Sequence, residues 1–259
     1  MNLDLDGKVA IVGGASQGIG YGIARAFARE GATVAITARR EADLHAAAER
    51  LRTETGAHIL PIQADCRRPA DCVRVADIAR RELGGIDILV NNDGAPPLGP
   101  ALSFDDTAWA KAVEQNLMSV VRMAREVVPL MKERGGGSIL NIAAISAIQP
   151  IPGFALSVAT WSGVIGYAKT LSLEVAAFGI NVNTICPGYI DTTRLQKVFA
   201  AGSEGAEVMK ARLTDEIPMK RIGTIDDIAS LASLLVSPKG RYVTGTAIQV
   251  DGGLLRATR

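Results

Sequence analysis

The segment Gly14-Ala15-Ser16-Gln17-Gly18-Ile19-Gly20 decides how this chain folds. It follows the apolar run Val9–Val12, which has the length of a buried strand, and it precedes a segment with helical periodicity. Glycines in such a turn let the backbone approach a pyrophosphate closely, and the N–H groups at the start of the helix attract its negative charge. This order of strand, turn and helix predicts a dinucleotide-binding turn, and the alternative is an ordinary glycine-rich loop.

Beyond this turn, short apolar runs alternate with longer segments of helical periodicity. We expect strands at residues 9–12, 33–37, 58–63, 86–90, 137–142, 181–186 and 247–250. We expect helices at residues 21–30, 41–55, 70–83, 106–134 (tightened near Pro129), 154–178 and 226–235. Strands that are apolar throughout and alternate with helices indicate a parallel sheet covered on both faces. The prediction is a doubly wound α/β sheet of about seven strands, a Rossmann fold, in one domain spanning residues 1–259.

One stretch departs from this alternation. Residues 191–223 form a long, mixed segment after the sixth predicted strand, and we expect it to be a substrate loop or lid within the single domain. Its apolar side chains are Leu195, Val198, Phe199, Met209 and Leu213. They suit an apolar substrate pocket, and they equally suit an amphipathic helix that docks on the core.

The end of the second predicted strand bears on which dinucleotide binds. Sites selective for NAD(H) place an acid there, whereas this chain has Ala38 followed by Arg39 and Arg40. A guanidinium forms charge-assisted hydrogen bonds with a 2′-phosphate, so we expect NADP(H) rather than NAD(H). The alternative is a solvated arginine pair at the start of a helix. Asp65, after the third strand, either accepts from the adenine amino group or caps the turn that follows.

The composition excludes several classes of function. A formal net charge of +1, from 28 basic and 27 acidic residues, and an aromatic content of 4% argue against a nucleic-acid-binding protein. The three cysteines form no Cys-x-x-Cys pair and there are two histidines, so we expect no metal site. The sequence begins without a signal-peptide pattern, and no apolar run reaches the ~18 residues of a membrane span. We therefore expect a soluble, cytoplasmic protein without a membrane partner.

Taken together, these motifs resemble the short-chain dehydrogenase/reductase (SDR) family in its form of about 250 residues. The motifs that carry the resemblance occur in the family's order: the glycine turn, Asp65, Asn91-Asn92-Asp93-Gly94, Asn116, Gly137-Ser138-Ile139-Leu140-Asn141-Ile142, Asn183, Pro187-Gly188 and Asp251-Gly252-Gly253. The resemblance implies a dinucleotide site made of Gly14, Ser16, Gln17, Gly18, Ile19, Gly20, Arg39, Arg40, Asp65, Cys66, Asn92, Gly94, Pro187, Gly188 and Ile190. It also implies a homodimer or homotetramer that pairs the helices at about residues 106–134 and 154–178.

The resemblance implies a reaction, and the residues that carry it are altered here. The family transfers hydride between NAD(P)H and a carbonyl or alcohol. It uses a Tyr as general acid or base, a Lys that lowers the pKa of the Tyr, a Ser that bonds the substrate oxygen and an Asn in a proton relay. An alignment without gaps puts Ser157 at the Tyr position, Trp161 at the Lys position and Ala144 at the Ser position. Asn116 is kept, and Asp93 replaces the alanine of Asn-Asn-Ala-Gly.

Neighbouring residues offer partial substitutes for the lost groups. Tyr167 lies ~15 Å along the helix axis from Ser157, too far to reach the same substrate atom. Ser146 can turn into the pocket, and Ser157 keeps a hydroxyl. Asp93 should lie near the nicotinamide, where a dry cleft raises the pKa of an acid so that it can donate a proton, and otherwise it caps a turn. The candidate catalytic residues are therefore Asn116, Asp93 and Ser157.

Three functions fit these residues. The first is an NADP(H)-dependent oxidoreductase that acts on a small, apolar carbonyl or alcohol with a non-standard proton donor, since orientation supplies much of the rate. The second is an inactive relative that binds the dinucleotide, or that joins an active SDR subunit in a hetero-oligomer. The third is a lyase or isomerase that uses Asp93 without redox chemistry. The intact glycine turn and Arg39 argue against the third function, and the replaced residues Ala144, Ser157 and Trp161 support the second. The first two functions are favoured almost equally, and the oxidoreductase comes first because its dinucleotide site is complete.

Overall fold

The computed structural model describes residues 2–94, 96–201 and 205–257. Within them, parallel strands form one seven-stranded sheet in the order β3-β2-β1-β4-β5-β6-β7. The strands are β1 (Val9–Val12), β2 (Thr33–Ala38), β3 (Ile59–Gln63), β4 (Ile88–Asn91), β5 (Gly137–Ile142), β6 (Ile180–Pro187) and β7 (Ala247–Val250). The chain runs outward from β1 to β3 and then crosses back to β4, so the predicted doubly wound sheet is confirmed. Sheets of this kind bind ligands at the reversal, here between β1 and β4.

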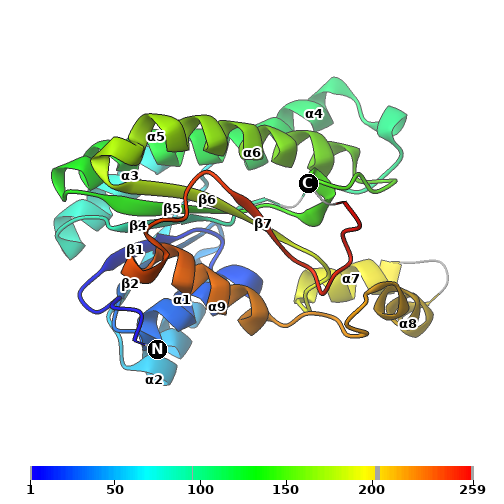
Figure 1. Cartoon of the computed structure of the whole chain (residues 1–259), viewed down its shortest axis with the longest axis horizontal. Coiled ribbons are helices and arrows are strands. Elements are labelled where there is room, and N and C mark those ends of the chain that lie inside the picture. The colour runs from blue at the N-terminus through cyan, green and yellow to red at the C-terminus, as the bar shows by residue number, and fades with distance from the viewer. Residues whose placement is uncertain (1, 95, 202–204, 258–259) are drawn as a thin grey trace.

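Helices cover both faces of the sheet (Figure 1). On one face lie α1 (Gly18–Arg29), α2 (Glu41–Thr55) and α9 (Ile225–Val236), and on the other lie α3 (Pro69–Leu83), α5 (Ser119–Glu133) and α6 (Ala155–Val175). Within β1, Ala10 and Val12 pack into the first of these layers and Ile11 packs into the second. Burial on both faces explains why the strands read as continuous apolar runs.

The helix predicted at residues 106–134 is not continuous α-helix. α4 (Asp106–Ala112) passes into a π-helical turn, η2 (Val113–Met118), before α5 begins. α5 continues through Pro129, so the irregularity lies earlier in the sequence than that proline. The other predicted helices and strands differ from the observed ones by three residues or fewer at each end. Single π turns within α-helices are frequently found at functional sites, and this one contains Asn116.

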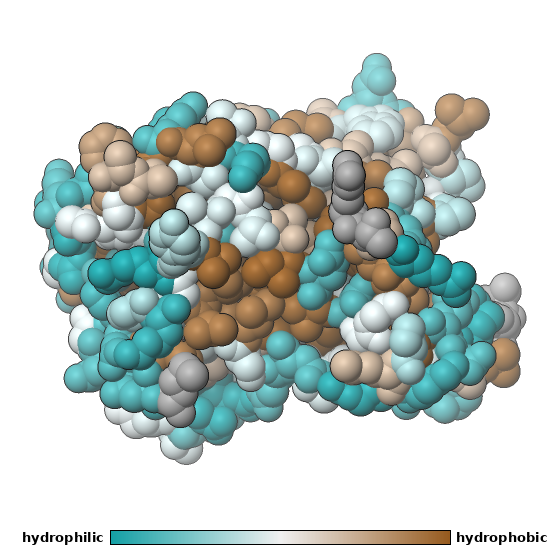
Figure 2. Space-filling view, in the orientation of Figure 1, coloured by the Kyte–Doolittle hydropathy of each residue, from teal (hydrophilic) through white to brown (hydrophobic). Residues whose placement is uncertain are grey.

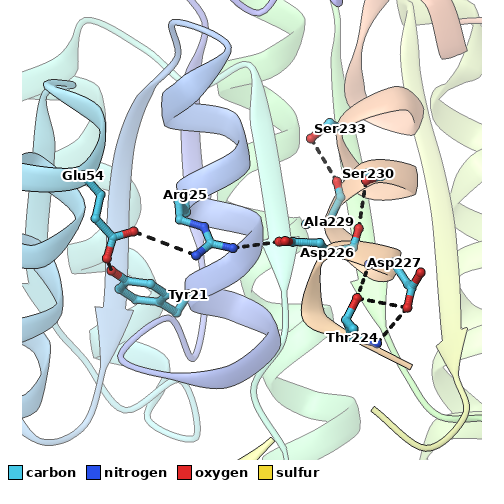
Figure 3. A network of polar contacts seen from close by, with 9 residues as sticks. All are labelled: Tyr21, Arg25, Glu54, Thr224, Asp226, Asp227, Ala229, Ser230 and Ser233. Atoms are coloured by element: carbon cyan, nitrogen blue, oxygen red, sulfur yellow. Dashed lines mark hydrogen bonds and ion pairs between the residues drawn. The ribbon is translucent and has the colours of Figure 1, made fainter. Parts of the chain in front are cut away.

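A polar network ties α1 to its neighbours beside the glycine turn (Figure 3). The Tyr21 hydroxyl donates to Glu54 of α2 at 2.8 Å. Arg25 forms an ion pair with Asp226 of α9 at 2.7 Å. Both contacts hold α1 in place, and the first turn of this helix starts at the carboxyl edge of the sheet.

The segment predicted to be a lid contains α7 (Thr193–Ala201) and α8 (Ala206–Glu216), which extend beyond the sheet at the lower right of Figure 1. Leu195, Phe199 and Leu213 are buried against one another, with Met209 packed beside them. These apolar side chains therefore form a small separate cluster that joins α7 to α8, and they do not dock a helix on the main core of the domain. A substrate-covering role for residues 191–223 stays a prediction.

The open edge of the sheet is apolar. All four residues of β7 are partly exposed, and Figure 2 shows hydrophobic side chains gathered over β7 and α9 in the middle of this face. An uncovered edge strand with apolar neighbours is often an association surface. Among the described residues, no helix combines the length and the apolar character needed to cross a membrane.

Candidate functional site

The glycine turn is held from the end of β4 by Asn92. Its side-chain amide donates to the carbonyl oxygens of Gly13 and Gly14, at 3.3 and 3.4 Å. A Cβ at Gly20 would lie 2.6 Å from both the Gly14 carbonyl oxygen and the Asn92 amide nitrogen, so only glycine fits there. α1 begins at Gly18, and no side chain in the described part of the chain caps its first N–H groups. These N–H groups remain available to bind an anion.

Most of the residues predicted to bind a dinucleotide lie along the same sheet edge. In or next to the turn and the strand ends are Gly14, Ser16, Gln17, Gly18, Ile19, Gly20, Arg39, Asp65, Cys66, Asn92, Gly94, Pro187 and Gly188. The Thr193 hydroxyl, at the start of α7, donates to the Gln17 side chain at 3.3 Å. Ile190 is buried and pairs with Gly223 across the base of the α7–α8 segment. The glycine turn therefore contacts the predicted lid directly.

The two arginines after β2 differ in their surroundings. Arg40 is the residue before α2 and forms an ion pair with Asp43 at 2.5 Å. Arg39 is exposed, and its guanidinium forms no hydrogen bond or ion pair within residues 2–94, 96–201 and 205–257. Arg39 is therefore the arginine of this pair whose guanidinium has no protein partner among the described residues, and contact of either arginine with a phosphate stays a prediction.

Asp65 is engaged by a neighbour on the same loop. Its carboxylate accepts from the Arg67 side chain at 2.8 and 2.5 Å and from the Arg67 backbone N–H at 3.2 Å. These bonds hold the pKa of Asp65 below its ordinary value. The residue that precedes α3 is Arg68, so Asp65 caps the turn and not the helix. Contact with an adenine amino group stays a prediction.

A cluster of buried polar side chains lies between η2 and α6. Asn116 is fully buried, and its side-chain amide donates a hydrogen bond to the Thr160 hydroxyl at 2.8 Å. The Thr160 hydroxyl in turn donates to the Leu156 carbonyl at 2.7 Å. The Ser157 hydroxyl lies 3.4 Å from the Ser146 hydroxyl. The side-chain oxygen of Asn116 has no hydrogen-bond partner among the described residues. Thr160 was not predicted, although its place three residues after Ser157 on one helix was a usable signal.

Trp161 fills the corner of this cluster. It is 4% exposed and packs in an apolar group with Val120 and Val164. A Cβ at Gly94 would overlap the Asn116 side-chain oxygen and lie 3.0 Å from the Trp161 ring. The alignment therefore places an indole, not an ammonium group, beside Asn116.

Asp93 belongs to a different group of side chains. It lines a small cavity with Arg39, Asp65 and Cys66. Burial raises the pKa of Asp93 to about 6, although the positive charge of Arg39 partly offsets this rise. The raised pKa agrees with the expectation, but the structure groups Asp93 with the predicted dinucleotide residues and not with Ser157. Gly94 lies between the two groups.

Comparisons with known proteins agree with this geometry. The family profile described as Enoyl-(Acyl carrier protein) reductase matches residues 14–255. Dehydrogenase/reductase SDR family member 4 of Homo sapiens is 33% identical over 250 residues, which cover 96% of this chain and 88% of that protein. L-Sorbose reductase from Gluconobacter frateurii, complexed with NADPH and L-sorbose, superimposes with a TM-score of 0.95, at 35% identity and with 99% and 100% of the two chains covered.

A second solved structure is similar at lower identity. 7α-Hydroxysteroid dehydrogenase complexed with NADH and 7-oxo glycochenodeoxycholic acid has a TM-score of 0.92 at 29% identity, with 100% of this chain and 98% of that chain covered. The profile match, the relatives and the seven-stranded sheet with its glycine turn lead to one conclusion: this chain belongs to the short-chain dehydrogenase/reductase family of oxidoreductases.

Proposed function

We propose that this protein is an NADP(H)-dependent oxidoreductase that acts on a carbonyl or alcohol without the family's Tyr–Lys pair. The observation that carries the proposal is the junction at Gly94 between two sites. On one side lie the glycine turn and the unpaired Arg39, and on the other lies the buried cluster around Asn116. A dinucleotide bound across this junction would reach both sites.

The dinucleotide fits the residues on the adenosine side. Glycine is required at position 20 by backbone contact, and the N–H groups at the start of α1 suit a pyrophosphate. Arg39 suits a 2′-phosphate because a guanidinium offers two parallel N–H donors to an oxyanion. The similar L-sorbose reductase binds NADPH and the similar 7α-hydroxysteroid dehydrogenase binds NADH. Arg39 is therefore the feature that favours NADP(H) for this chain.

When bound, NADPH supplies the hydride, and the chain's own residues must manage the proton. Ser157 would donate a hydrogen bond to the substrate oxygen as negative charge develops there, and it would then pass its proton to that oxygen. Ser146 is 3.4 Å away and buried, so it would hold the Ser157 oxygen and return a proton to it, and a water molecule would then replace the proton on Ser146. Asn116 and Thr160 fix this side of the pocket, and the unpartnered Asn116 oxygen can hold a relay water.

A non-catalytic dinucleotide-binding subunit is the second candidate. Trp161 favours it, because a buried indole against Gly94 replaces the ammonium group that would hold the nicotinamide ribose. The two candidates differ in turnover. Steady-state assays with NADPH against L-sorbose, a ketosteroid and simple aryl ketones would separate them, and turnover of none of these would favour the binding subunit.

Replacing Arg39 should change which dinucleotide binds. In Arg39→Gln, we expect the Kd for NADP⁺ to rise about 10- to 100-fold, because the guanidinium–phosphate pair is lost, while the Kd for NAD⁺ changes little. The matched control is Arg40→Gln, whose side chain pairs with Asp43 and should leave both constants nearly unchanged. Calorimetry measures the constants.

Thermal unfolding of the wild type with each of NADP⁺, NADPH, NAD⁺ and NADH provides the broader test. A ligand at about 100 times its Kd stabilises the fold by about 2.7 kcal/mol. If none of the four dinucleotides raised the unfolding temperature, the proposed function would be contradicted. If Arg39→Gln weakened the affinity for NADP⁺ and for NAD⁺ equally, only the proposed role of Arg39 would be contradicted, and the proposed function would stand.

We also propose a homodimer or homotetramer formed through the outward faces of α4, α5 and α6, with an active SDR subunit as the alternative partner. Leu173 of α6 is 72% exposed, and the apolar edge at β7 offers a further surface. Light scattering after size exclusion should give two or four times the chain mass of 27.2 kDa. In Leu173→Glu the mass should fall, whereas a monomeric wild type would rule the assembly out.

A further inference from the structure

Asp93 lies where the carboxyl ends of three strands meet. It follows β4, and together with Arg39 after β2 and Asp65 after β3 it lines a cavity of about 40 Å³. The other residues that line this cavity are Cys66, Arg67, Gly94, Gln115 and Ser119. This is the edge of the crevice on which the predicted adenosine-binding residues converge.

The carboxyl group of Asp93 reaches toward the glycine turn. A Cβ at Gly13 would lie only 2.5 Å from the Asp93 Oδ2 atom. Gly13 is fixed by a hydrogen bond from its backbone N–H to the Val90 carbonyl, at 2.9 Å. The missing side chain at Gly13 therefore makes room for the carboxyl group directly beside the turn.

Several titratable side chains from the segments after β2 and β3 and from α3 surround Asp93. The titratable groups that face it are Arg39, Asp65, Cys66, Arg67 and Cys72. Arg67 is already paired with Asp65. Arg39 is the positive charge in this group that forms no ion pair among the described residues, so it is the one that a carboxylate and an incoming anion would share.

We propose that the Asp93 carboxylate competes with the 2′-phosphate of NADP(H) for Arg39, and that it thereby sets the choice between NADP(H) and NAD(H). This inference rests on the proposed function, in which Arg39 meets the 2′-phosphate. Ionised Asp93 repels the phosphate and neutralises part of the field of Arg39. A 2′-hydroxyl carries no charge, so NAD(H) is much less affected. Asp93 is then a specificity-determining residue of the dinucleotide site.

The competition depends on pH. Burial raises the pKa of Asp93 to about 6, so the carboxyl group changes charge between about pH 5 and pH 7. The opposition to NADP(H) is absent below this range and complete above it. A 2′-phosphate also titrates near pH 6, and its own binding improves as the pH rises. Because the phosphate titrates in the same way with both proteins, the effect of Asp93 is measured at each pH as the Kd of the wild type divided by the Kd of a variant that lacks the carboxylate.

The experiment measures Kd for NADP⁺ and NAD⁺ by calorimetry from pH 5 to pH 8, in wild type, Asp93→Asn and Glu82→Gln. Glu82 is an exposed carboxylate on α3, and its variant removes the same charge elsewhere. For NADP⁺ we expect the ratio of wild-type Kd to Asp93→Asn Kd to rise from about 1 at pH 5 to about 10 at pH 8. For NAD⁺, and for Glu82→Gln with either dinucleotide, the ratio should stay near 1.

Each outcome has a distinct meaning. If Asp93→Asn binds both dinucleotides with an unchanged preference at every pH, the inference is overturned and the proposed function stands. If the variant weakens both equally, Asp93 has only a structural role and the inference is again overturned. Should Asp93→Asn fold poorly, Asp93→Ser takes its place in the same measurement. If the wild type binds neither dinucleotide, the proposed function itself fails and the inference falls with it.

Discussion

A variant with Ala144→Ser, Ser157→Tyr and Trp161→Lys should reduce carbonyl compounds with NADPH at least 10²-fold faster than the wild type, measured as kcat/KM. The phenol would enter the pocket beside Ser146, which now faces Ser157. The ammonium group would occupy the corner by Gly94 and Asn116, where it would lower the pKa of the phenol. The assay follows NADPH absorbance with L-sorbose and aryl ketones as substrates.

The matched control for this variant carries Ser157→Phe with the same two other changes. It supplies the ring and the cation without the hydroxyl, so a gain in the Tyr variant alone assigns the rate to proton transfer. Removing Trp161 from its apolar group should lower the stability, so circular dichroism must first show that both variants are folded. A folded, dinucleotide-binding Tyr variant no faster than the Phe variant would mean that the surrounding pocket has also diverged.

Asp93→Asn should be more stable than the wild type at pH 8 by up to about 3 kcal/mol, and equal to it near pH 4. The pKa of Asp93 rises in the folded protein from 3.8 to about 6. A raised carboxyl pKa favours folding while the group is protonated in both states, below about pH 3.8. That contribution is lost as the pH rises through about 6, where the folded protein must hold a negative charge at this half-buried position. Asp93→Asn stays uncharged at every pH, so it does not lose this contribution.

Urea unfolding at pH 4, 6 and 8 measures this difference without any dinucleotide. Glu82→Gln serves as the control for a lost negative charge, because its carboxylate is exposed and should give the same stability as the wild type at every pH. A wild type that is as stable as Asp93→Asn at pH 8 would show that the carboxyl group is solvated or paired in solution, and that its pKa is not raised.

The fold followed from the sequence because its strongest signals are local. Apolar runs such as Val9–Val12, ending at glycines, gave strands in register with one another, and the glycine turn gave the start of α1. The π turn at Val113–Met118 could not be predicted in this way. It differs from an α-helix by one added residue, and the single phase shift of about 100° that this residue produces is too small a feature of the hydrophobic pattern to locate from one sequence.

The sequence motifs located residues that act on the backbone of the glycine turn, but they could not show how side chains from different strands and helices would be oriented. Gly20 and Asn92 act on the glycine turn, and their motifs identified them. The direction of Asp93 depends on the empty space at Gly13, which only the packed strands reveal. Thr160 was missed because a helical threonine usually bonds the preceding turn, as this one does, and its second bond to Asn116 crosses between helices.

The π turn has a consequence for insertions and deletions. Such a turn is an α-helix with one residue added, so deleting one residue from Val113–Met118 would restore regular α-helix. Everything on one side of the deletion would then rotate by about 100° about the helix axis. Asn116 would leave Thr160, or α4 would turn its buried Ala112 toward solvent. The number of residues between α4 and α5 is therefore constrained as strictly as their identity, and a frame-preserving loss of a single codon here would be more harmful than most substitutions.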